Sequence, residues 1–230
     1  MARAKGIIDE GAIGDILAVE ARECHSGSHS PYQLKKKYCG GGVLMNLGVY
    51  PLGLALWLIN SPINRVYAEM GILYHKFEAE DHASLFIRFK NNAIATIHTS
   101  YIVKGGLDDR TEIYGTDGSI YIDLFRTSSV KVYSEKGYSY VLEKASLSTN
   151  WTSPSVDEAW QLGYSREIEH FLNCILKDTN PFPDGDFGKR VLEVVFAAYK
   201  SVEETEALTE LSARFPRRSS PMGRAWVHAP

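Results

Sequence analysis

The region from residue 64 to residue 143 constrains the fold most, because it is patterned as one strand after another. Every second residue of 83–89 is apolar, and the alternation returns in 93–101 after a turn at Asn91 and Asn92. Asparagine tolerates the positive φ that a tight hairpin turn requires. Further turns at Thr116–Gly118 and at Lys136-Gly137 extend the series. Consecutive hairpins indicate an antiparallel sheet, which often has only one face covered within its domain.

Helical patterns flank this region on both sides. Residues 2–9 and 43–59 precede it, and residues 164–177 and 187–206 follow it, with apolar side chains at helical spacing. Residues 16–24 alternate in the manner of one more strand, placed well before the others in the chain.

These elements predict an α+β fold, with a large, mainly antiparallel sheet and helices packed on one of its faces. No βαβ unit is apparent in the pattern, so we expect no Rossmann domain. Residues 1–211 are expected to form a single domain, and residues 212–230 an irregular tail that lacks periodicity. A chain of 230 residues buries enough surface to fold without disulfides.

Composition excludes several classes of partner. The net charge is −3 and no basic stripe occurs, so nucleic acid is not expected as a partner. The longest apolar run is broken by polar residues, glycine and proline, and is shorter than the ~20 residues of a membrane span. The N-terminus lacks the apolar core of a signal peptide. Three cysteines, Cys24, Cys39 and Cys174, are typical of reduced thiols. We therefore expect a cytoplasmic protein with no membrane partner.

The apolar run that follows the glycines at 40–42 carries two polar side chains. Asn46, Tyr50, Gly53 and Trp57 recur at steps of four, three and four, which places them on one stripe of a helix. The proline after Tyr50 lacks a backbone donor and disfavours helical geometry at Tyr50, so a kink or a helix restart is expected there. Two polar groups one turn apart on a buried helix can both reach one small ligand.

The polar loop of residues 25–42 is long for a compact domain, and such loops are usually functional or mobile. Its candidate substrate contacts are His25, His29, Lys37, Gly41 and Gly42. Lys37 also belongs to a run of three lysines, and such runs are more typical of a solvated surface than of a binding site. Zinc is an alternative, since Cys24, His25, His29 and Cys39 are residue types that bind it, but their spacing matches no common structural site and we expect no metal.

Other candidates lie farther along the chain. Arg166 and His170 are one turn apart at the start of a helix, where they could reach a substrate or form a surface pair. His98 and Tyr101 could face a pocket, but the outer face of the sheet is the expected place for both. The glycines at 40–42 follow no strand and lack the context of a dinucleotide-binding motif, so a phosphate cradle is not expected.

Four parts of the sequence, in this order, resemble the carboxy-terminal half of the Gfo/Idh/MocA oxidoreductases. They are IIDEGAIGDILAVEAR, GGGVLMNLGVYPLGLALWL, YGTDGSIYID and the pair REIEHFLNCIL and GKRVLEVVFAAYKSVEE, and the resemblance covers about residues 1–204. Members of that family join a Rossmann domain to an α/β domain with a large, mostly antiparallel sheet. The resemblance implies that this chain is the second of these domains and lacks the first.

The family pattern G-G-G-x-L-x-D-x-G-x-H falls on residues 40–50 of this chain. In the family the Asp and the His, or a Tyr in one branch, face the nicotinamide and the substrate, and the His or Tyr exchanges a proton with the substrate hydroxyl. The resemblance therefore implies catalytic roles for Asn46 and Tyr50. A phenol is a weak acid and needs a nearby cation to act as a base at neutral pH. In the family a lysine from the Rossmann half helps. Asn46 can orient a hydroxyl but lacks the charge of the family carboxylate.

Two functions remain open. The first, implied by the resemblance, is the substrate-binding and oligomerisation half of an NAD(P)-dependent sugar or polyol oxidoreductase that is inactive alone. It binds no cofactor by itself, while NAD or NADP serves the complete enzyme. Its expected partners are a second copy bound through the sheet, as a homodimer or tetramer, and a small sugar-like substrate. A separate Rossmann-domain chain is the further partner if that domain is not part of the same polypeptide. The alternative is a non-enzymatic ligand-binding or scaffold module derived from the family, which Asn46 favours.

Overall fold

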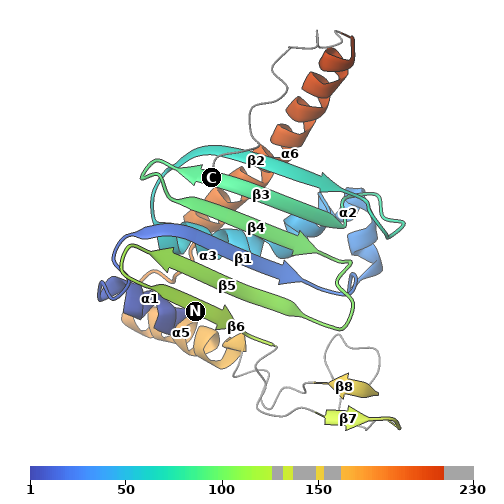
Figure 1. The fold of residues 1–230 in the computed structure, drawn as a ribbon. Coiled ribbons are helices and arrows are strands. Elements are labelled where there is room, and N and C mark those ends of the chain that lie inside the picture. The colour runs from blue at the N-terminus through green and yellow to red at the C-terminus, as the bar shows by residue number, and fades with distance from the viewer. Residues whose placement is uncertain (126–131, 137–148, 153–161, 215–230) are drawn as a thin grey trace, which may run out of the picture.

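The computed structural model describes residues 1–125, 132–136, 149–152 and 162–214. Gly137 of the expected Lys136-Gly137 turn and most of the expected tail lie outside these residues. A six-stranded sheet forms the centre of the molecule, in the order β2-β3-β4-β1-β5-β6 (Figure 1). Its strands are β1 (Ile16–Cys24), β2 (Ile63–Gly71), β3 (His82–Phe89), β4 (Ile94–Ser100), β5 (Asp108–Gly115) and β6 (Ser119–Asp123). A separate two-stranded sheet pairs β7 (Val132–Ser134) with β8 (Asn150–Thr152).

The sheet is mixed but mostly antiparallel. Strand β1 pairs in parallel with β4, from Ala18 opposite Ile94 to Cys24 opposite Ser100, and every other pair in the sheet is antiparallel. The first strand of the chain therefore lies between β4 and β5, in the interior of the sheet. The predicted α+β class is confirmed, and the parallel pair is a feature that hairpin patterns alone could not predict.

The hairpin between β3 and β4 differs in detail from the expectation. Phe89 N–H donates to Ala93 C=O at 2.9 Å, and Asn92 N–H donates to Phe89 C=O at 3.1 Å. Asn92 has a positive φ of 69°, whereas Asn91 does not. The turn therefore places one residue, and not two, in the left-handed region, which is the geometry of a longer hairpin loop.

The helices gather on one face of the sheet. Figure 1 looks onto the opposite face, with α3 and α6 behind the strands. The helical segments are α1 (Ala2–Asp9), η1 (Pro31–Leu34), α2 (Lys36–Cys39), η2 (Leu44–Gly48), α3 (Val49–Ile59), α5 (Tyr164–Lys177) and α6 (Gly185–Arg214). The long loop of residues 25–42 thus contains two short helical turns, and α6 continues three residues into the expected tail.

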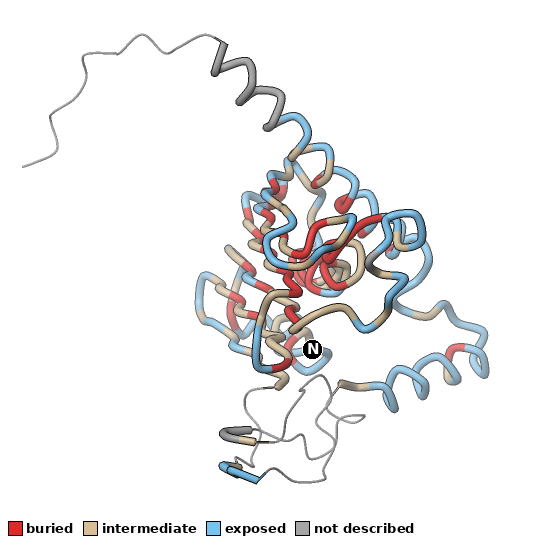
Figure 2. The backbone as a smooth tube through the Cα atoms, turned by 90° about the vertical axis from the view of Figure 1, so that its right-hand side faces the viewer, coloured by how far each residue is buried: buried red, intermediate tan, exposed pale blue. Residues whose placement is uncertain are grey.

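The core lies between the sheet and these helices. Alternate strand residues such as Val19, Leu85 and Ile97 are fully buried, and they share one cluster with Leu52 of α3 and Val195 of α6. Figure 2 shows the buried residues gathered in this central layer. The helical run Lys36–Ile59 is long and apolar enough to cross a membrane, but 61% of its apolar window is buried inside the protein. Most of this run therefore belongs to the core of the domain, where η2 and α3 pack against the sheet.

The expected irregularity in the apolar run occurs earlier than predicted. Residues Leu44–Gly48 form a π-helical turn, and the regular helix α3 starts at Val49. Pro51 therefore lies inside the first turn of α3 and not at a kink. The wider π turn precedes a proline that has no N–H to donate to the carbonyl of Leu47, so the backbone adjusts before the proline is reached.

The expected polar stripe does not continue along α3. A Cβ built on Gly53 would lie 3.5 Å from Phe187 and 3.7 Å from Val191 of α6, so this part of the stripe packs against a helix. The ring of Trp57 lies 5.5 Å from that of Phe182. Only Asn46 and Tyr50 remain as polar groups near the start of the helix, and the rest of the predicted stripe serves packing.

Helix α5 presents its apolar side to solvent. The sequence predicts Ile168, Phe171, Leu172 and Ile175 on one side of this helix, and all four are more than half exposed. The buried residue of α5 is Cys174. Soluble proteins seldom leave a contiguous apolar helix face uncovered, and such a face usually marks an interaction surface.

Candidate functional site

The site is built around a turn that begins where α2 ends. Gly40 follows α2 with a φ of 73°, a left-handed conformation that favours glycine. Gly41 and Gly42 are required for a different reason, which is lack of space. A Cβ on Gly41 would lie 2.2 Å from the Tyr199 hydroxyl, and one on Gly42 would lie 2.0 Å from the Glu80 carbonyl oxygen. The turn is therefore pressed directly against α6 and the segment before β3.

A carboxylate already occupies the position that an anion would take on this turn. The Glu80 side chain, 7% exposed, accepts hydrogen bonds from Gly42 N–H at 3.0 Å and from Leu44 N–H at 3.1 Å. Free N–H groups at the start of a helix are what a phosphate-binding loop offers. Here Glu80 uses them, and no βα unit surrounds the glycines, so the turn does not fit the diphosphate of NAD or NADP.

Asn46 on η2 is joined to the sheet by a side-chain hydrogen bond. Its amide nitrogen donates to the Tyr101 hydroxyl, and its backbone N–H donates to Gly42 C=O at 3.2 Å. Tyr101 is 1% exposed, and burial raises the pKa of its hydroxyl. The expectation that Tyr101 lies on the outer face is wrong. His98 does lie there, because residues three apart on a strand point to opposite faces.

Tyr50 is 66% exposed at the start of α3, one turn beyond Asn46. Its phenol is therefore available to a ligand or a partner surface. Lys37 is exposed as well and lies 5.7 Å from the ring of Tyr38. Lys35, two residues earlier, pairs with Glu78 at 2.9 Å, which ties the loop before the glycines to the segment before β3. The lysine run is thus part of the rim around the turn.

The two loop histidines form a hydrogen-bonded line with a carboxylate. His25 is 3% exposed, and its Nε2 lies 2.9 Å from Glu23 Oε1. Its Nδ1 lies 3.2 Å from His29 Nε2, and the His29 ring is exposed. The line therefore runs from β1 to the surface. Asn46, which is hydrogen-bonded to Tyr101, lies at the same end of the sheet. Three of the predicted candidates, His25, His29 and Asn46, therefore gather there.

Glu23 also meets a second carboxyl group. It lies opposite Asp109 of β5 and opposite Thr99 of β4, so the three form one polar row on the helix-covered face. Burial, together with the charge and hydrogen bond of Glu23, raises the pKa of Asp109 to about 8. Two carboxyls in contact share a proton, because both cannot be charged at low cost. The buried Thr99 hydroxyl, which has no protein partner among the described residues, lies in the same row.

The zinc alternative is not supported by the arrangement of its residues. Cys24 is buried, and burial with the charge of Asp108 raises the pKa of its thiol to about 12, which disfavours a metal-binding thiolate. Cys39 hydrogen-bonds to Gly41 C=O and other backbone oxygens of its own loop. Among the described residues, no group of three or more His, Cys, Asp or Glu could hold a metal ion.

Arg166 and His170 are not part of this site. Both are exposed on α5, which lies near α1 and β6, whereas α2 lies at the other end of the sheet (Figure 1). His170 Nε2 accepts the Phe182 N–H at 3.0 Å, a contact that holds the following loop. Helical spacing predicts that Arg166 and His170 lie near each other. It does not predict their distance from Tyr50, because that distance depends on where α5 packs in the fold.

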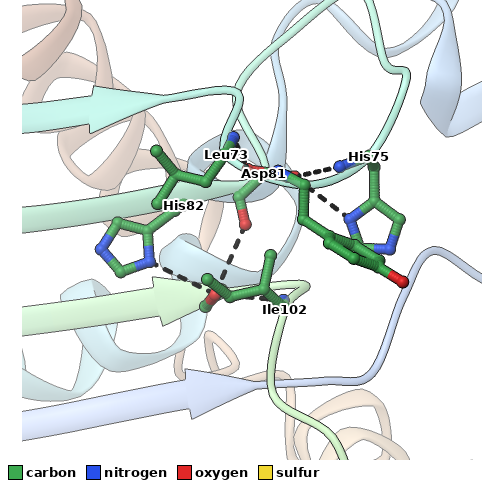
Figure 3. Close-up of polar contacts among 7 residues, drawn as sticks. Leu73, His75, Asp81, His82 and Ile102 are labelled. Carbon is green, nitrogen blue, oxygen red and sulfur yellow. Dashed lines mark hydrogen bonds and ion pairs between the residues drawn. The ribbon is translucent and has the colours of Figure 1, made fainter.

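A second buried acid organises the loop beside the site. Asp81, fully buried, accepts hydrogen bonds from the backbone N–H groups of Leu73, Tyr74 and His75 at 2.7–3.0 Å. Figure 3 shows these contacts, with His75 Nδ1 at 3.1 Å from the same carboxylate. The His75 ring stacks on Phe77 at 4.6 Å, and Phe77 meets Tyr101 edge-on at 5.9 Å. Asp81 therefore supports the aromatic wall behind Tyr101.

Sequence reasoning missed the residues that hold the site together. Glu80, Asp81 and Tyr199 were not candidates, although two adjacent acids directly before a buried strand are an unusual pattern. Glu80 and Tyr199 are far apart in the chain, so only the folded structure brings them to the same turn. A cavity of about 550 Å³ lies at the other end of α3, between Asn60, Val66 and Arg190, and includes none of the predicted residues.

Comparisons with known proteins agree with this architecture. The chain is 24% identical over 210 residues to myo-inositol 2-dehydrogenase of Thermotoga maritima, covering 89% of this chain and 59% of that protein. It is 24% identical over 221 residues to D-xylose 1-dehydrogenase [NADP(+)] of Haloarcula marismortui, covering 91% and 56%. The crystal structure of GenD2 from gentamicin A biosynthesis, in complex with NAD, superposes with a TM-score of 0.82 at 25% identity, covering 89% and 58%.

The chain thus spans somewhat more than half the length of these relatives. The sequence model of the GFO/IDH/MocA C-terminal domain matches residues 1–121, which include the glycine turn, Asn46, Tyr50 and the first five strands. The sheet, the helices on one face and the order of the motifs all agree with that match. This chain belongs to the GFO/IDH/MocA C-terminal domain family.

Proposed function

We propose that this chain forms the substrate-binding side of an NAD(P)-dependent sugar or polyol oxidoreductase. The nicotinamide is then held by a nucleotide-binding domain outside these 230 residues, in the same longer polypeptide or in a separate chain. One observation carries the proposal, which is that Asn46 and Tyr50 lie one turn apart beside the glycine turn, with Asn46 fixed by the buried Tyr101. The relatives named as inositol and xylose dehydrogenases support a polyhydroxylated substrate.

The chemistry assigned to these residues is binding and proton handling. The Tyr50 phenol exchanges a proton with the reacting hydroxyl of the substrate, and Asn46 orients that hydroxyl by hydrogen bonding. His29 lies at the same end of the sheet, where its exposed imidazole can contact a further hydroxyl, and the buried His25 supports it from behind. Lys37, Gly41 and Gly42 form the rim on the side of the glycine turn. The cytoplasm is the proposed location.

The chain alone should bind polyols with a dissociation constant in the millimolar range. Asn46→Ala and Tyr50→Phe should each raise that constant about tenfold, which corresponds to ~1.4 kcal/mol for a lost hydrogen bond. Tyr67→Phe, the same change at the exposed edge strand β2, is the matched control and should leave binding unchanged. Isothermal calorimetry with myo-inositol and D-xylose measures all four proteins.

The same calorimetry tests where the cofactor is held. NAD and NADP should give no binding heat with the chain alone, and a micromolar dissociation constant for either would contradict the proposed division of labour. Absence of polyol binding by the unmodified chain, at ligand concentrations of tens of millimolar, would contradict the substrate role of the site.

A non-enzymatic ligand-binding or scaffold role is the second candidate. The observation that favours it is the amide at position 46, since Asn46 donates to Tyr101 and cannot carry a negative charge. Polyol binding that is retained with Tyr50→Phe, and no turnover when a nucleotide-binding domain is supplied, would favour this second role over the first.

We also propose that the uncovered sheet face joins two copies of the chain. One register row of this face runs from Tyr67 and Phe86 through Glu20 and Glu112 to Tyr121. Its three aromatic side chains are 46–68% exposed. The neighbouring row places Arg22 and Arg110 beside the two glutamates. A face that alternates aromatic, acidic and basic groups is suited to self-complementary packing around a two-fold axis.

Light scattering after gel filtration should give the mass of a dimer or tetramer at micromolar concentration. The double variant Phe86→Asp, Tyr121→Asp should give a monomer, because it removes two of the three exposed aromatic side chains of the row and adds two negative charges to the row that already holds Glu20 and Glu112. Phe196→Asp, the same kind of change at an exposed position of α6 on the opposite side of the sheet, is the control and should keep the oligomer. A monomeric mass for the unmodified chain would rule the sheet interface out.

A further inference from the structure

The Glu80 carboxylate is a buried anion held entirely by hydrogen bonds. Besides Gly42 N–H and Leu44 N–H, it accepts the hydroxyl hydrogen of Tyr199 at 2.8 Å. The Glu80 backbone carbonyl accepts Val43 N–H at 2.8 Å. Among the ion pairs of the described residues none involves Glu80, so its charge is balanced by these donors and by the positive end of the helix that starts here.

The donors come from parts of the chain that are remote in sequence. Glu80 precedes β3, the N–H groups belong to the glycine turn and η2, and Tyr199 lies on α6. The Tyr199 hydroxyl also approaches Gly42 N–H at 3.3 Å. Burial and the nearby Glu80 charge raise the pKa of Tyr199, so its hydroxyl remains a donor at neutral pH. Three elements therefore meet at one carboxylate.

This carboxylate sets the path of the backbone that carries the candidate site. Gly42, which it holds, accepts the backbone N–H of Asn46 at 3.2 Å. The Asn46 side chain then reaches Tyr101 on the sheet. A displacement of the glycine turn would therefore move Asn46 relative to Tyr101. Neither Gly41 nor Gly42 has space for a side chain, so the turn is closely packed and cannot shift without its neighbours.

We propose that Glu80 and Tyr199 are positioning residues that hold the glycine turn and η2 so that Asn46 and Tyr50 meet the substrate. This inference rests on the proposed function, and it adds that α6, at the far end of the chain, controls the affinity of the polyol site. Neither residue touches the substrate. They act through the turn. The Glu80 carboxylate accepts the N–H groups that a bound anion would otherwise contact, and this fixes the position of the turn.

The decisive variant is Tyr199→Phe, which removes one hydroxyl and keeps the ring that packs in the core. Its thermal unfolding midpoint should remain within a few degrees of the unmodified chain. Hydrogen–deuterium exchange of peptides spanning residues 40–47 should accelerate about tenfold, while peptides from β1 and β4 keep their rates. The dissociation constant for myo-inositol should rise about tenfold. Glu80→Gln keeps one acceptor oxygen and should shift both quantities in the same direction.

Ser201→Ala is the matched control on the same helix. The Ser201 hydroxyl accepts Ala68 N–H of β2 at 3.2 Å, so its loss removes a hydrogen bond from α6 to a different element. It should change exchange near residue 68 only and leave polyol affinity unchanged. Unchanged exchange at residues 40–47 in Tyr199→Phe would overturn the inference. Accelerated exchange with unchanged polyol affinity would also overturn it. If the unmodified chain binds no polyol, the proposed function fails while the exchange data still decide whether the turn is held as described.

Discussion

Replacing Asp81 with alanine should lower the free energy of unfolding by about 3 kcal/mol or more, the largest effect expected for a polar residue of this chain. The carboxylate is fully buried and accepts hydrogen bonds from three consecutive backbone N–H groups, with His75 Nδ1 beside it. Alanine would leave these donors without an acceptor. Asp81→Asn is the smaller change, because it keeps one acceptor oxygen and replaces the other oxygen by an NH2 group. Urea unfolding followed by tryptophan fluorescence measures both variants.

The pH dependence separates this explanation from a general packing defect. Burial alone would raise the pKa of Asp81, but the hydrogen bonds from His75, Leu73 and Tyr74 outweigh it, and the pKa lies below its usual value. The stabilisation is therefore fully present above the unfolded pKa of about 3.9 and is lost as the pH falls through the lower folded pKa. The difference between Asp81→Asn and the unmodified chain should be largest at pH 7 and shrink below pH ~4. Asp9→Ala, at an exposed ion pair with Lys5, should cost at most about 0.5 kcal/mol.

Gly42→Ala is the second change with a large expected effect, about 3 kcal/mol of lost stability together with loss of polyol binding. Its Cβ would lie 2.0 Å from the Glu80 carbonyl oxygen and 2.6 Å from the Glu80 carboxylate. Both belong to a buried residue that is held by several hydrogen bonds, so neither can move away cheaply. The whole turn would have to separate from Glu80, and the hydrogen bonds at the start of η2 would break.

Gly188→Ala provides the matched comparison. Gly188 lies in α6, is exposed and has no atom within 4 Å of its Cβ position, so alanine there should stabilise the chain by ~0.5–1 kcal/mol through helix propensity. Differential scanning calorimetry should therefore show opposite shifts for two identical substitutions. An unfolding midpoint for Gly42→Ala equal to that of the unmodified chain would contradict the close approach described for the turn.

The general architecture was predictable because it depends on local patterns. Strand β1 begins and ends at the predicted residues, and the turn between β5 and β6 falls at the predicted Thr116–Gly118. Period-two alternation and tight-turn residues determine such elements locally. The motif order also identified the family. The sequence also predicts the apolar side of α5 but not that this side is exposed. Helical periodicity shows which residues share a face, and it does not show what covers that face.

The candidate site was predictable only in part. The apolar run predicts Asn46 and Tyr50, whereas the strand pattern predicts the wrong face for Tyr101 and gives no sign of Glu80. These residues act through contacts between distant segments, which a single sequence does not encode in its spacing. The π turn at Leu44–Gly48 is a further example, because it shifts the helical phase and ends the predicted stripe after Tyr50.

The place of β1 in the sheet has a consequence for how the protein is made. Ala18 lies beside Ile94 on one side and Tyr114 on the other, so β1 leaves the ribosome well before either of its neighbours in the sheet. During that interval its apolar residues remain open to chaperones and to aggregation, and closure of such distant contacts makes assembly slow. Helix α6, which supplies Tyr199, is synthesised long after the glycine turn, so the turn gains this contact late in synthesis.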